Sequence, residues 1–275
     1  MGEKTPKLVV VDEDGTFLDL GGKEFSRERF SRVFDRMTAA SCRFAVATSN
    51  QSFQVEEVFG ELASQVGIIA SNGAFVADGH KVLDVRRACS EAVSRVVAVH
   101  AEHPEIPLCA VCEKGAWVEP WTDPDFVANM TLYSCNMREV QSLGDACATD
   151  SVLMYWSRVP EAELACSVGL FRDALGDLMD VVDSGCEDGW GYFDVVQRGV
   201  SKASGASRLM DCWGIAAQDV IAFGDAGNDV EMLKLAGTGY AMGNADDAVK
   251  AAADRVCAPC REQGVLRVLE EIFVA

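Results

Sequence analysis

Residues 7–18 read KLVVVDEDGTFL, and this stretch decides the fold. The apolar run at residues 7–11 predicts a strand that is buried on both faces of a sheet. Asp12 and Asp14 follow it with one residue between them, and Gly15 turns the chain directly afterwards. In a doubly wound sheet the carboxyl ends of the strands face the ligand crevice, so both carboxylates are expected at one site. An exposed acidic turn remains the alternative for this segment alone.

A second stretch repeats this arrangement near the C-terminus, where residues 219–229 read DVIAFGDAGND. The apolar residues predict a strand over 219–224, followed by Asp225 and then by Asp229 in the first turn of a helix. As an alternative, Asn228 or Asp229 could simply cap the helix without any role in a site. Capping accounts for one polar residue, but it does not account for Gly224-Asp225 before it or for the similar pattern at Asp12.

Strands and helices alternate through both ends of the chain, which predicts an α/β fold with a parallel sheet covered on both faces. The expected strands are residues 7–11, 42–47, 67–70, 219–224, 239–242 and 255–257. The expected helices include residues 25–37, 55–62, 202–213 and 228–235. In the middle, strand-like runs come in near-consecutive pairs, which predicts an antiparallel sheet with helices on one face. We therefore expect a core domain at 1–83 and 196–275, interrupted by an inserted α+β domain at 84–195.

Composition excludes several classes of function. The chain has 24 basic and 43 acidic residues and a formal net charge of −19, so a nucleic-acid partner is not expected. It has no apolar stretch of about 18 residues, so no membrane span is expected. The acidic residues that follow the first apolar run do not fit a signal peptide. Eleven scattered cysteines indicate reduced thiols and a cytoplasmic location rather than a disulfide framework.

Two cysteine pairs have the CxxC spacing, Cys109 with Cys112 and Cys257 with Cys260. A four-thiolate zinc site would need both pairs in one place, and no histidine lies beside either pair. We expect buried or incidental thiols, with a zinc site as the alternative.

Carboxylates that gather at strand ends repel one another, and a hard divalent cation with oxygen ligands removes that cost. Mg²⁺ typically takes one or two carboxylates together with a substrate phosphate, so the pattern indicates phosphate chemistry. Thr48 and Ser49 follow the second expected strand and offer hydroxyl groups. Lys202 begins an expected helix, where free N–H groups also favour an anion.

These residues carry a resemblance to the haloacid dehalogenase superfamily. Its four motifs are matched, in order, by DEDGT at 12–16, Thr48, Lys202 and GDAGND at 224–229. The flanking segments SNGA at 71–74, GVSK at 199–202 and FGDAGNDVEMLKLAGTGYAMGNA at 223–245 are similar to the Cof-like hydrolase branch and to its bacterial sugar phosphatases. The resemblance covers residues 7–83 and 190–270. It implies a doubly wound, Rossmann-like parallel-sheet core with an inserted α+β cap domain.

The resemblance also implies roles for single residues. Asp12 would be the nucleophile that forms an aspartyl-phosphate, and Asp14 would protonate the leaving oxygen and then activate water. Mg²⁺ would be bound by Asp12, the backbone carbonyl of Asp14 and Asp225. Asp229 would either be an additional ligand or support the ligands from behind. The phosphate oxygens would be held by Thr48, Ser49, Lys202 and Asn228. The expected substrate is a small phosphorylated metabolite, and the resemblance favours a sugar phosphate. The expected assembly is a monomer or weak homodimer.

Two departures from the family pattern stand out. The second motif reads TSNQ at 48–51, without the usual glycine and arginine, and Glu13 adds a negative charge inside the first motif. The sequence does not say which way Glu13 points. A phosphotransferase or phosphomutase using the same aspartyl-phosphate, and a non-enzymatic phosphate-binding regulatory protein, remain alternatives. The inserted domain is expected to act as a lid, with Trp117, Trp121, Trp156 and Trp190 as candidates for substrate contacts or for core positions.

Overall fold

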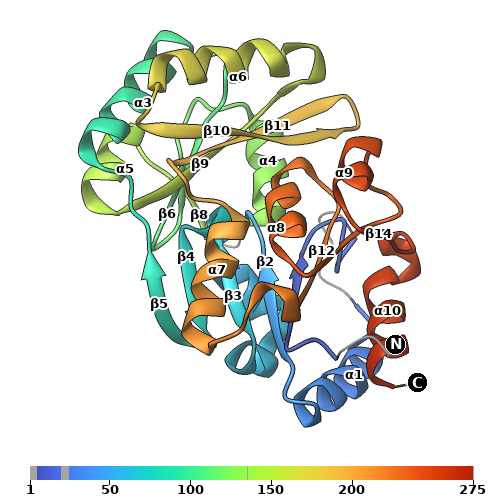
Figure 1. Ribbon diagram of the computed structural model, residues 1–275. Coiled ribbons are helices and arrows are strands. Elements are labelled where there is room, and N and C mark those ends of the chain that lie inside the picture. Colours follow the sequence, from blue (N-terminus) through green and yellow to red (C-terminus); the bar gives the residue numbers. More distant parts are fainter. Residues whose placement is uncertain (1–4, 20–24, 135, 275) are drawn as a thin grey trace. The chain divides into compact units, whose positions relative to one another are not determined.

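The computed structural model describes residues 5–19, 25–134 and 136–274 (Figure 1). By its internal contacts the chain divides into two compact units, residues 1–84 with 202–275, and residues 85–201. We describe each unit by itself. No helix among the described residues is both long enough and apolar enough to cross a membrane.

The first unit is built on an eight-stranded sheet with the order β14-β13-β12-β1-β2-β3-β4-β5. Neighbouring strands from β14 to β3 are parallel, and β4 pairs with β3 in the antiparallel direction. The chain winds outward from β1 in one direction and returns on the other side through β12, which confirms the doubly wound core. The strands are β1 (Leu8–Asp12), β2 (Arg43–Ala47), β3 (Gly67–Ala70), β4 (Phe75–Asp78), β5 (Lys81–Val85), β12 (Val220–Gly224), β13 (Thr238–Ala241) and β14 (Arg255–Val256).

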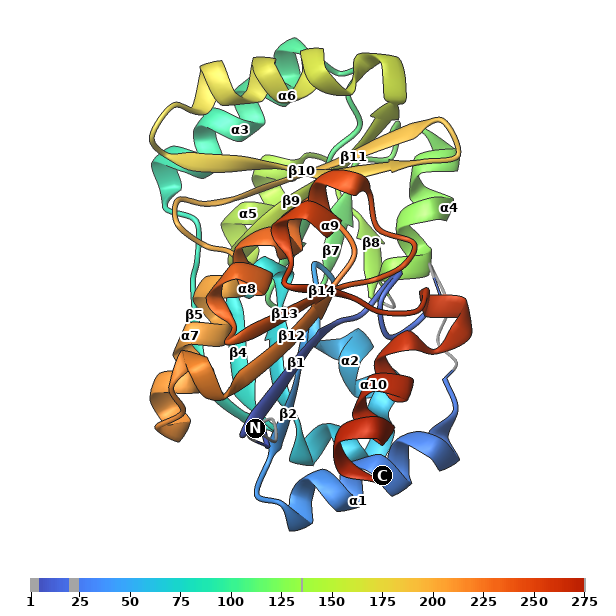
Figure 2. The same ribbon diagram turned by 45° about the vertical axis from the view of Figure 1, so that its right-hand side comes forward.

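Both faces of this sheet are covered, as the continuous apolar strands predict. Val9 and Val11 belong to a cluster with side chains of α1, α2 and α10, whereas Leu8 and Val10 belong to a cluster with α7, α8 and α9. Figure 2 shows the two groups of helices on opposite sides of the sheet. The helices are α1 (Arg27–Ala39), α2 (Ser52–Phe59), α7 (Lys202–Trp213), α8 (Val230–Leu235), α9 (Asp247–Ala252) and α10 (Gly264–Phe273).

The second unit contains a six-stranded sheet with the order β10-β11-β9-β6-β7-β8. Its pairings are antiparallel except for β7 with β8, which are parallel. The strands are β6 (Cys109–Cys112), β7 (Ala116–Val118), β8 (Met137–Glu139), β9 (Val152–Pro160), β10 (Met179–Glu187) and β11 (Trp190–Gln197). This is the α+β organisation expected of the inserted segment.

The helices of the second unit do not all lie on one face, contrary to the expectation from the sequence. α3 (Ser90–Glu102), α5 (Leu143–Thr149) and α6 (Glu161–Leu175) pack against one face of the sheet. α4 (Pro124–Tyr133) contributes Phe126 and Met130 to a cluster on the opposite face. The buried side chains of β6 alternate between the two clusters, so both faces need apolar cover.

The described cysteines do not gather into a zinc site. Cys109 and Cys112 lie on one strand, and their side chains join clusters on opposite faces of the sheet. The described cysteines are free, and burial raises the pKa of Cys109 to about 12, which keeps this thiol protonated. Among the described residues, the group able to hold a metal ion consists of aspartates alone.

Candidate active site

Three aspartates predicted from separate segments converge at the carboxyl ends of β1 and β12. These strands are adjacent, with Val11 paired to Phe223. Asp12 ends β1, Asp225 follows β12, and Asp229 lies in the short 3-10 turn Gly227–Asp229. Each offers one oxygen to a group whose atoms all lie within 4.8 Å of one another. The strand ends therefore form an acidic site, as the two sequence stretches predict.

Lys202 supplies the positive charge of this site. It is the first residue of α7 and is only 2% exposed. Its Nζ lies 2.5 Å from Oδ1 of Asp12 and 2.8 Å from Oδ1 of Asp229. Burial alone would lower the pKa of the ammonium group, but the two carboxylates outweigh it and hold the pKa above its ordinary value. Lys202 is therefore a fixed cation between two carboxylates.

One lysine does not balance three carboxylates in so buried a place. Burial raises the pKa of Asp225 to about 9, and the charges of Asp12 and Asp229 add to the effect. Burial and the charge of Asp12 raise the pKa of Asp229 to about 6. The cluster thus has fewer positive than negative groups, and it offers the hard oxygen donors that Mg²⁺ prefers. The residues present fit a divalent cation.

Glycines and amides hold the acidic loops in place. Gly15 has φ +79°, and a Cβ there would lie 2.3 Å from Oδ2 of Asp225, so a side chain at this position would strain the backbone and displace the Asp225 carboxylate. Thr16 donates its hydroxyl to Oδ1 of Asp225 at 3.0 Å. Asn244 donates from Nδ2 to the carbonyl of Gly15 at 2.9 Å and to Oδ2 of Asp225 at 3.1 Å. Asp225 is therefore oriented from two sides.

Asn244 is a site residue that the sequence reasoning missed. It follows β13 by three positions, so it lies at the same edge of the sheet as the predicted residues. Asn244 lies in the segment GNA at 243–245, which is part of the family resemblance. The segment carries no charge, so a search for charged residues at strand ends did not select it.

Asp14 and Glu13 lie beside this cluster in contact with the second motif. Nδ2 of Asn50 donates to Oδ2 of Asp14 at 2.6 Å and to Oε2 of Glu13 at 3.1 Å. Glu13 has no exposed surface, so its side chain points into the protein. Burial, followed by the charge of Asp14, raises the pKa of Glu13 to about 8, although hydrogen bonds from Asn50 and Thr48 oppose the shift.

The predicted phosphate-binding residues occupy different surroundings. Thr48 follows β2, is 1% exposed, and accepts a hydrogen bond from the backbone N–H of Asn50 at 3.0 Å. Ser49 comes next and is half-buried. Asn228 neighbours Asp229 in sequence, and its Nδ2 donates to Oδ1 of Asn72 at 3.4 Å. Thr48 thus bonds to the backbone of Asn50, and Asn228 bonds to the side chain of Asn72.

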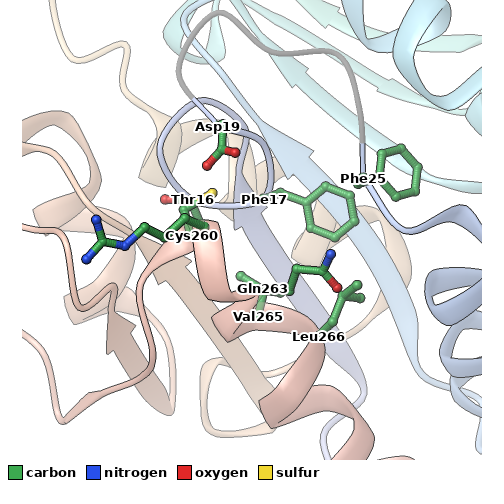
Figure 3. A pocket seen from close by; sticks show the side chains of 9 residues that line it. Thr16, Phe17, Asp19, Phe25, Cys260, Gln263, Val265 and Leu266 are labelled. Carbon is green, nitrogen blue, oxygen red and sulfur yellow. The ribbon is translucent and has the colours of Figure 1, made fainter.

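A separate cavity lies near the first motif and does not contain the predicted site (Figure 3). Thr16 connects the two, because it lines the cavity and donates to Asp225. The lining residues are Thr16, Phe17, Asp19, Phe25, Cys260, Arg261, Gln263, Val265 and Leu266. This set has one acidic and one basic side chain and mostly apolar neighbours, so it does not resemble a phosphate site.

Known proteins are similar to this chain over nearly its whole length. A family model described as haloacid dehalogenase-like hydrolase matches residues 9–269. The 5-amino-6-(5-phospho-D-ribitylamino)uracil phosphatase of Escherichia coli (strain K12) is 32% identical over 270 residues, covering 97% of this chain and 96% of that protein. A phosphoglycolate phosphatase of Halorubrum lacusprofundi is 37% identical over 265 residues, covering 96% of each. A solved structure from Streptococcus mutans UA159 matches with a TM-score of 0.90 at 27% identity, covering 98% of this chain and 100% of that one.

Proposed function

This chain belongs to the haloacid dehalogenase-like hydrolase family, and from that premise we propose that it is a Mg²⁺-dependent phosphatase that works through an aspartyl-phosphate. Relatives that match over their whole length are named phosphatases, so the chain is a phosphatase of small phosphorylated substrates. The observation that carries the finer proposal is the placement of Lys202 between Asp12 and Asp229, with Asp225 in the same cluster.

The metal proposal rests on the oxygen donors and on the shortage of positive charge around them. Mg²⁺ would be held by the carboxylates of Asp12, Asp225 and Asp229 and by the backbone carbonyl of Asp14, and it would screen the negative charge of nucleophile and phosphate. Lys202 supplies part of this screening by itself, because its ammonium group lies 2.5 Å from Asp12.

The protein's own groups divide the reaction into two steps. An oxygen of Asp12 bonds to phosphorus while the bond to the leaving oxygen breaks, and Asp14 gives that oxygen a proton. Asp14 then takes a proton from water, whose oxygen attacks phosphorus, so that inorganic phosphate leaves and Asp12 is regenerated. Lys202, Thr48, Ser49 and Asn228 would hold the phosphate oxygens, with positioning and electrostatics supplying most of the rate.

We propose a phosphorylated sugar or sugar alcohol as the substrate. The relative from Escherichia coli is named for a substrate whose phosphate is carried by a ribityl chain, and this supports a polyol ester. The second motif carries Asn50 in place of an arginine, so the site is less basic than the family pattern would make it. We further propose that the segment 84–195 acts as the cap that selects substrates, and that the enzyme is cytoplasmic and a monomer or weak homodimer.

The proposal is tested by phosphate release from a panel of esters, with Mg²⁺ and with EDTA. The panel holds 5-amino-6-(5-phospho-D-ribitylamino)uracil, several hexose and pentose phosphates, phosphoglycolate and a nucleotide. We expect turnover only with the metal and highest kcat/KM for a sugar or polyol ester. Equal turnover in EDTA would overturn the metal assignment, and preference for the nucleotide would overturn the substrate class.

A further inference from the structure

We propose that Glu13 and Asn50 form a positioning pair that fixes the carboxyl group of Asp14 for proton transfer. The inference rests on the proposed function, because it concerns how the general acid of that reaction is held. Both residues were singled out in the sequence, Asn50 in place of the usual arginine and Glu13 as an added charge in the first motif, and in the structure they contact each other.

Asn50 is held rigidly by its own backbone. It is 2% exposed, its N–H donates to the hydroxyl oxygen of Thr48 at 3.0 Å, and its carbonyl accepts from the N–H of Ser71 at 2.8 Å. With both backbone groups bonded to neighbours from two strand ends, the side chain leaves the main chain from a fixed point. A side-chain amide fixed in this way can hold in place the groups to which it donates hydrogen bonds.

The amide group of Asn50 donates its hydrogens to two carboxyl groups. Nδ2 lies 2.6 Å from Oδ2 of Asp14 and 3.1 Å from Oε2 of Glu13. With its nitrogen on this side, the amide donates to two carboxyl oxygens, which accept hydrogen bonds. The amide of Asn50 therefore bridges Asp14, the acid proposed for catalysis, and Glu13, which has no proposed role in proton transfer.

Glu13 anchors the other end of this bridge. It has no exposed surface, and Oε2 of a carboxyl group can accept a hydrogen bond whether or not the group carries a proton. An apolar side chain at position 13 would leave the second amide hydrogen unbonded in a buried place and would let the amide rotate. Glu13 thus acts on Asp14 through Asn50.

The two roles of Asp14 explain why its position must be held by Asn50 and Glu13. Asp14 has to present a proton to the leaving oxygen in one step and accept one from water in the next, so its carboxyl plane must stay fixed. General acid catalysis typically contributes about 10²–10⁴ to a rate, and a misplacement of about 1 Å can cost about 10² of it. Loss of the hydrogen bonds that hold Asp14 should therefore lower the rate most for esters whose leaving group needs a proton.

The test compares two esters in variants of this pair. 4-Nitrophenyl phosphate has a leaving group that departs without a proton, whereas an alkyl ester such as a polyol phosphate needs one. We expect Asn50→Leu, which keeps the side-chain size but has no donor, to lower kcat/KM for the alkyl ester by about 30-fold or more and for the nitrophenyl ester by less than about threefold. Asn50→Ser serves the same purpose if the leucine variant does not fold.

Variants of Glu13 and a control define the pair. Glu13→Gln keeps an acceptor, so the ratio of the two kcat/KM values should stay within about twofold of wild type, whereas Glu13→Met should shift it in the direction of Asn50→Leu. The double variant should lose no more than Asn50→Leu alone, since both changes break one bridge. Val58→Ala, a core change in α2 away from the bridge, should lower stability without altering the ratio.

An equal loss for both esters in Asn50→Leu and Asn50→Ser would overturn the positioning role and leave a structural one. Additive losses in the double variant would overturn the link to Glu13. Failure of the wild-type enzyme to hydrolyse either ester would refute the proposed function instead, so the two failures are distinguishable.

Discussion

The ammonium nitrogen of Lys202 lies 2.5 Å from Oδ1 of Asp12, although 190 positions separate the two residues in the chain. Asp12 ends the strand in the middle of the core sheet, and Lys202 begins the helix that returns the chain to this unit. The contact therefore joins the first and last segments of the core. It also sets the electrostatics on which the following predictions depend.

Replacement of Lys202 should damage both catalysis and stability. Lys202→Met removes the cation between Asp12 and Asp229, and breaking a buried ion pair typically costs about 3–5 kcal/mol. We expect kcat/KM to fall by about 10²–10³, the range for loss of one electrostatic contact to the transition state. Steady-state kinetics and urea unfolding in EDTA measure the two effects. Lys7→Met is the control, because Lys7 pairs with Asp219 but is 54% exposed, so it should cost no more than about 1 kcal/mol. Similar losses in both variants would contradict the assignment.

Asp12→Asn should abolish turnover and preserve the fold. The amide has the size of the carboxyl group and keeps an oxygen for Lys202, but it cannot form the aspartyl-phosphate. We expect activity to fall by at least about 10⁴-fold, with a far-UV circular dichroism spectrum like that of wild type. Acid quenching during turnover should trap a phosphorylated protein in the wild type and none in the variant. Asp247→Asn, at an exposed position of α9, should leave both readouts unchanged. Phosphorylation of the Asp12→Asn protein would refute the nucleophile assignment.

Binding of Mg²⁺ should strengthen as the pH rises. The pKa is raised to about 9 for Asp225 and to about 6 for Asp229 in the metal-free protein. Protons therefore compete with the metal for each carboxylate at pH values below its pKa. Each raised pKa also means that the metal-free fold binds a proton more tightly than the unfolded chain does. The contribution of these groups to stability is therefore greatest at low pH and is lost as pH rises toward the folded pKa.

Thermal unfolding between pH 6 and pH 9 measures this directly. We expect the gain in Tm on adding Mg²⁺ to grow across the range, because the metal replaces protons at Asp225 and Asp229. Asp225→Asn should flatten the dependence and raise the Mg²⁺ concentration needed for half-maximal activity. A gain in Tm that stays constant with pH in the wild type would contradict the prediction.

Gly15→Ala should disturb the acidic site more than it disturbs the backbone. Its φ of +79° penalises any side chain, and the new Cβ would lie 2.3 Å from Oδ2 of Asp225. Gly189→Ala is the control, with φ +81° and nothing within 4 Å of the added Cβ. The backbone penalty alone is about 1–2 kcal/mol, so urea unfolding should show that loss in the control and a larger one in Gly15→Ala. Only Gly15→Ala should weaken Mg²⁺ binding in calorimetry. Equal metal affinity in both variants would contradict the proposed contact.

Much of the fold was predictable because its signals are local. Residues 8–11 are all apolar, so the strand presents apolar side chains to both faces of the sheet. The structure buries Leu8 and Val10 on one side and Val9 and Val11 on the other. The placement of α4 was not predictable in this way. Phe126 and Met130 show that the helix has an apolar side, but not which face of the sheet it covers.

The sequence by itself determined the alternation of elements, the doubly wound core and the set of charged residues at strand ends, because apolar periodicity and the rule for parallel strands need no knowledge of distant contacts. Only the tertiary structure decided that Glu13 points inward and that Asn50 joins it to Asp14. A strand pattern places Glu13 on the face of Val11 but does not say what covers that face at the strand end. The cover comes from the segment after β2, more than thirty positions away, and contacts between such segments depend on packing that no local pattern records.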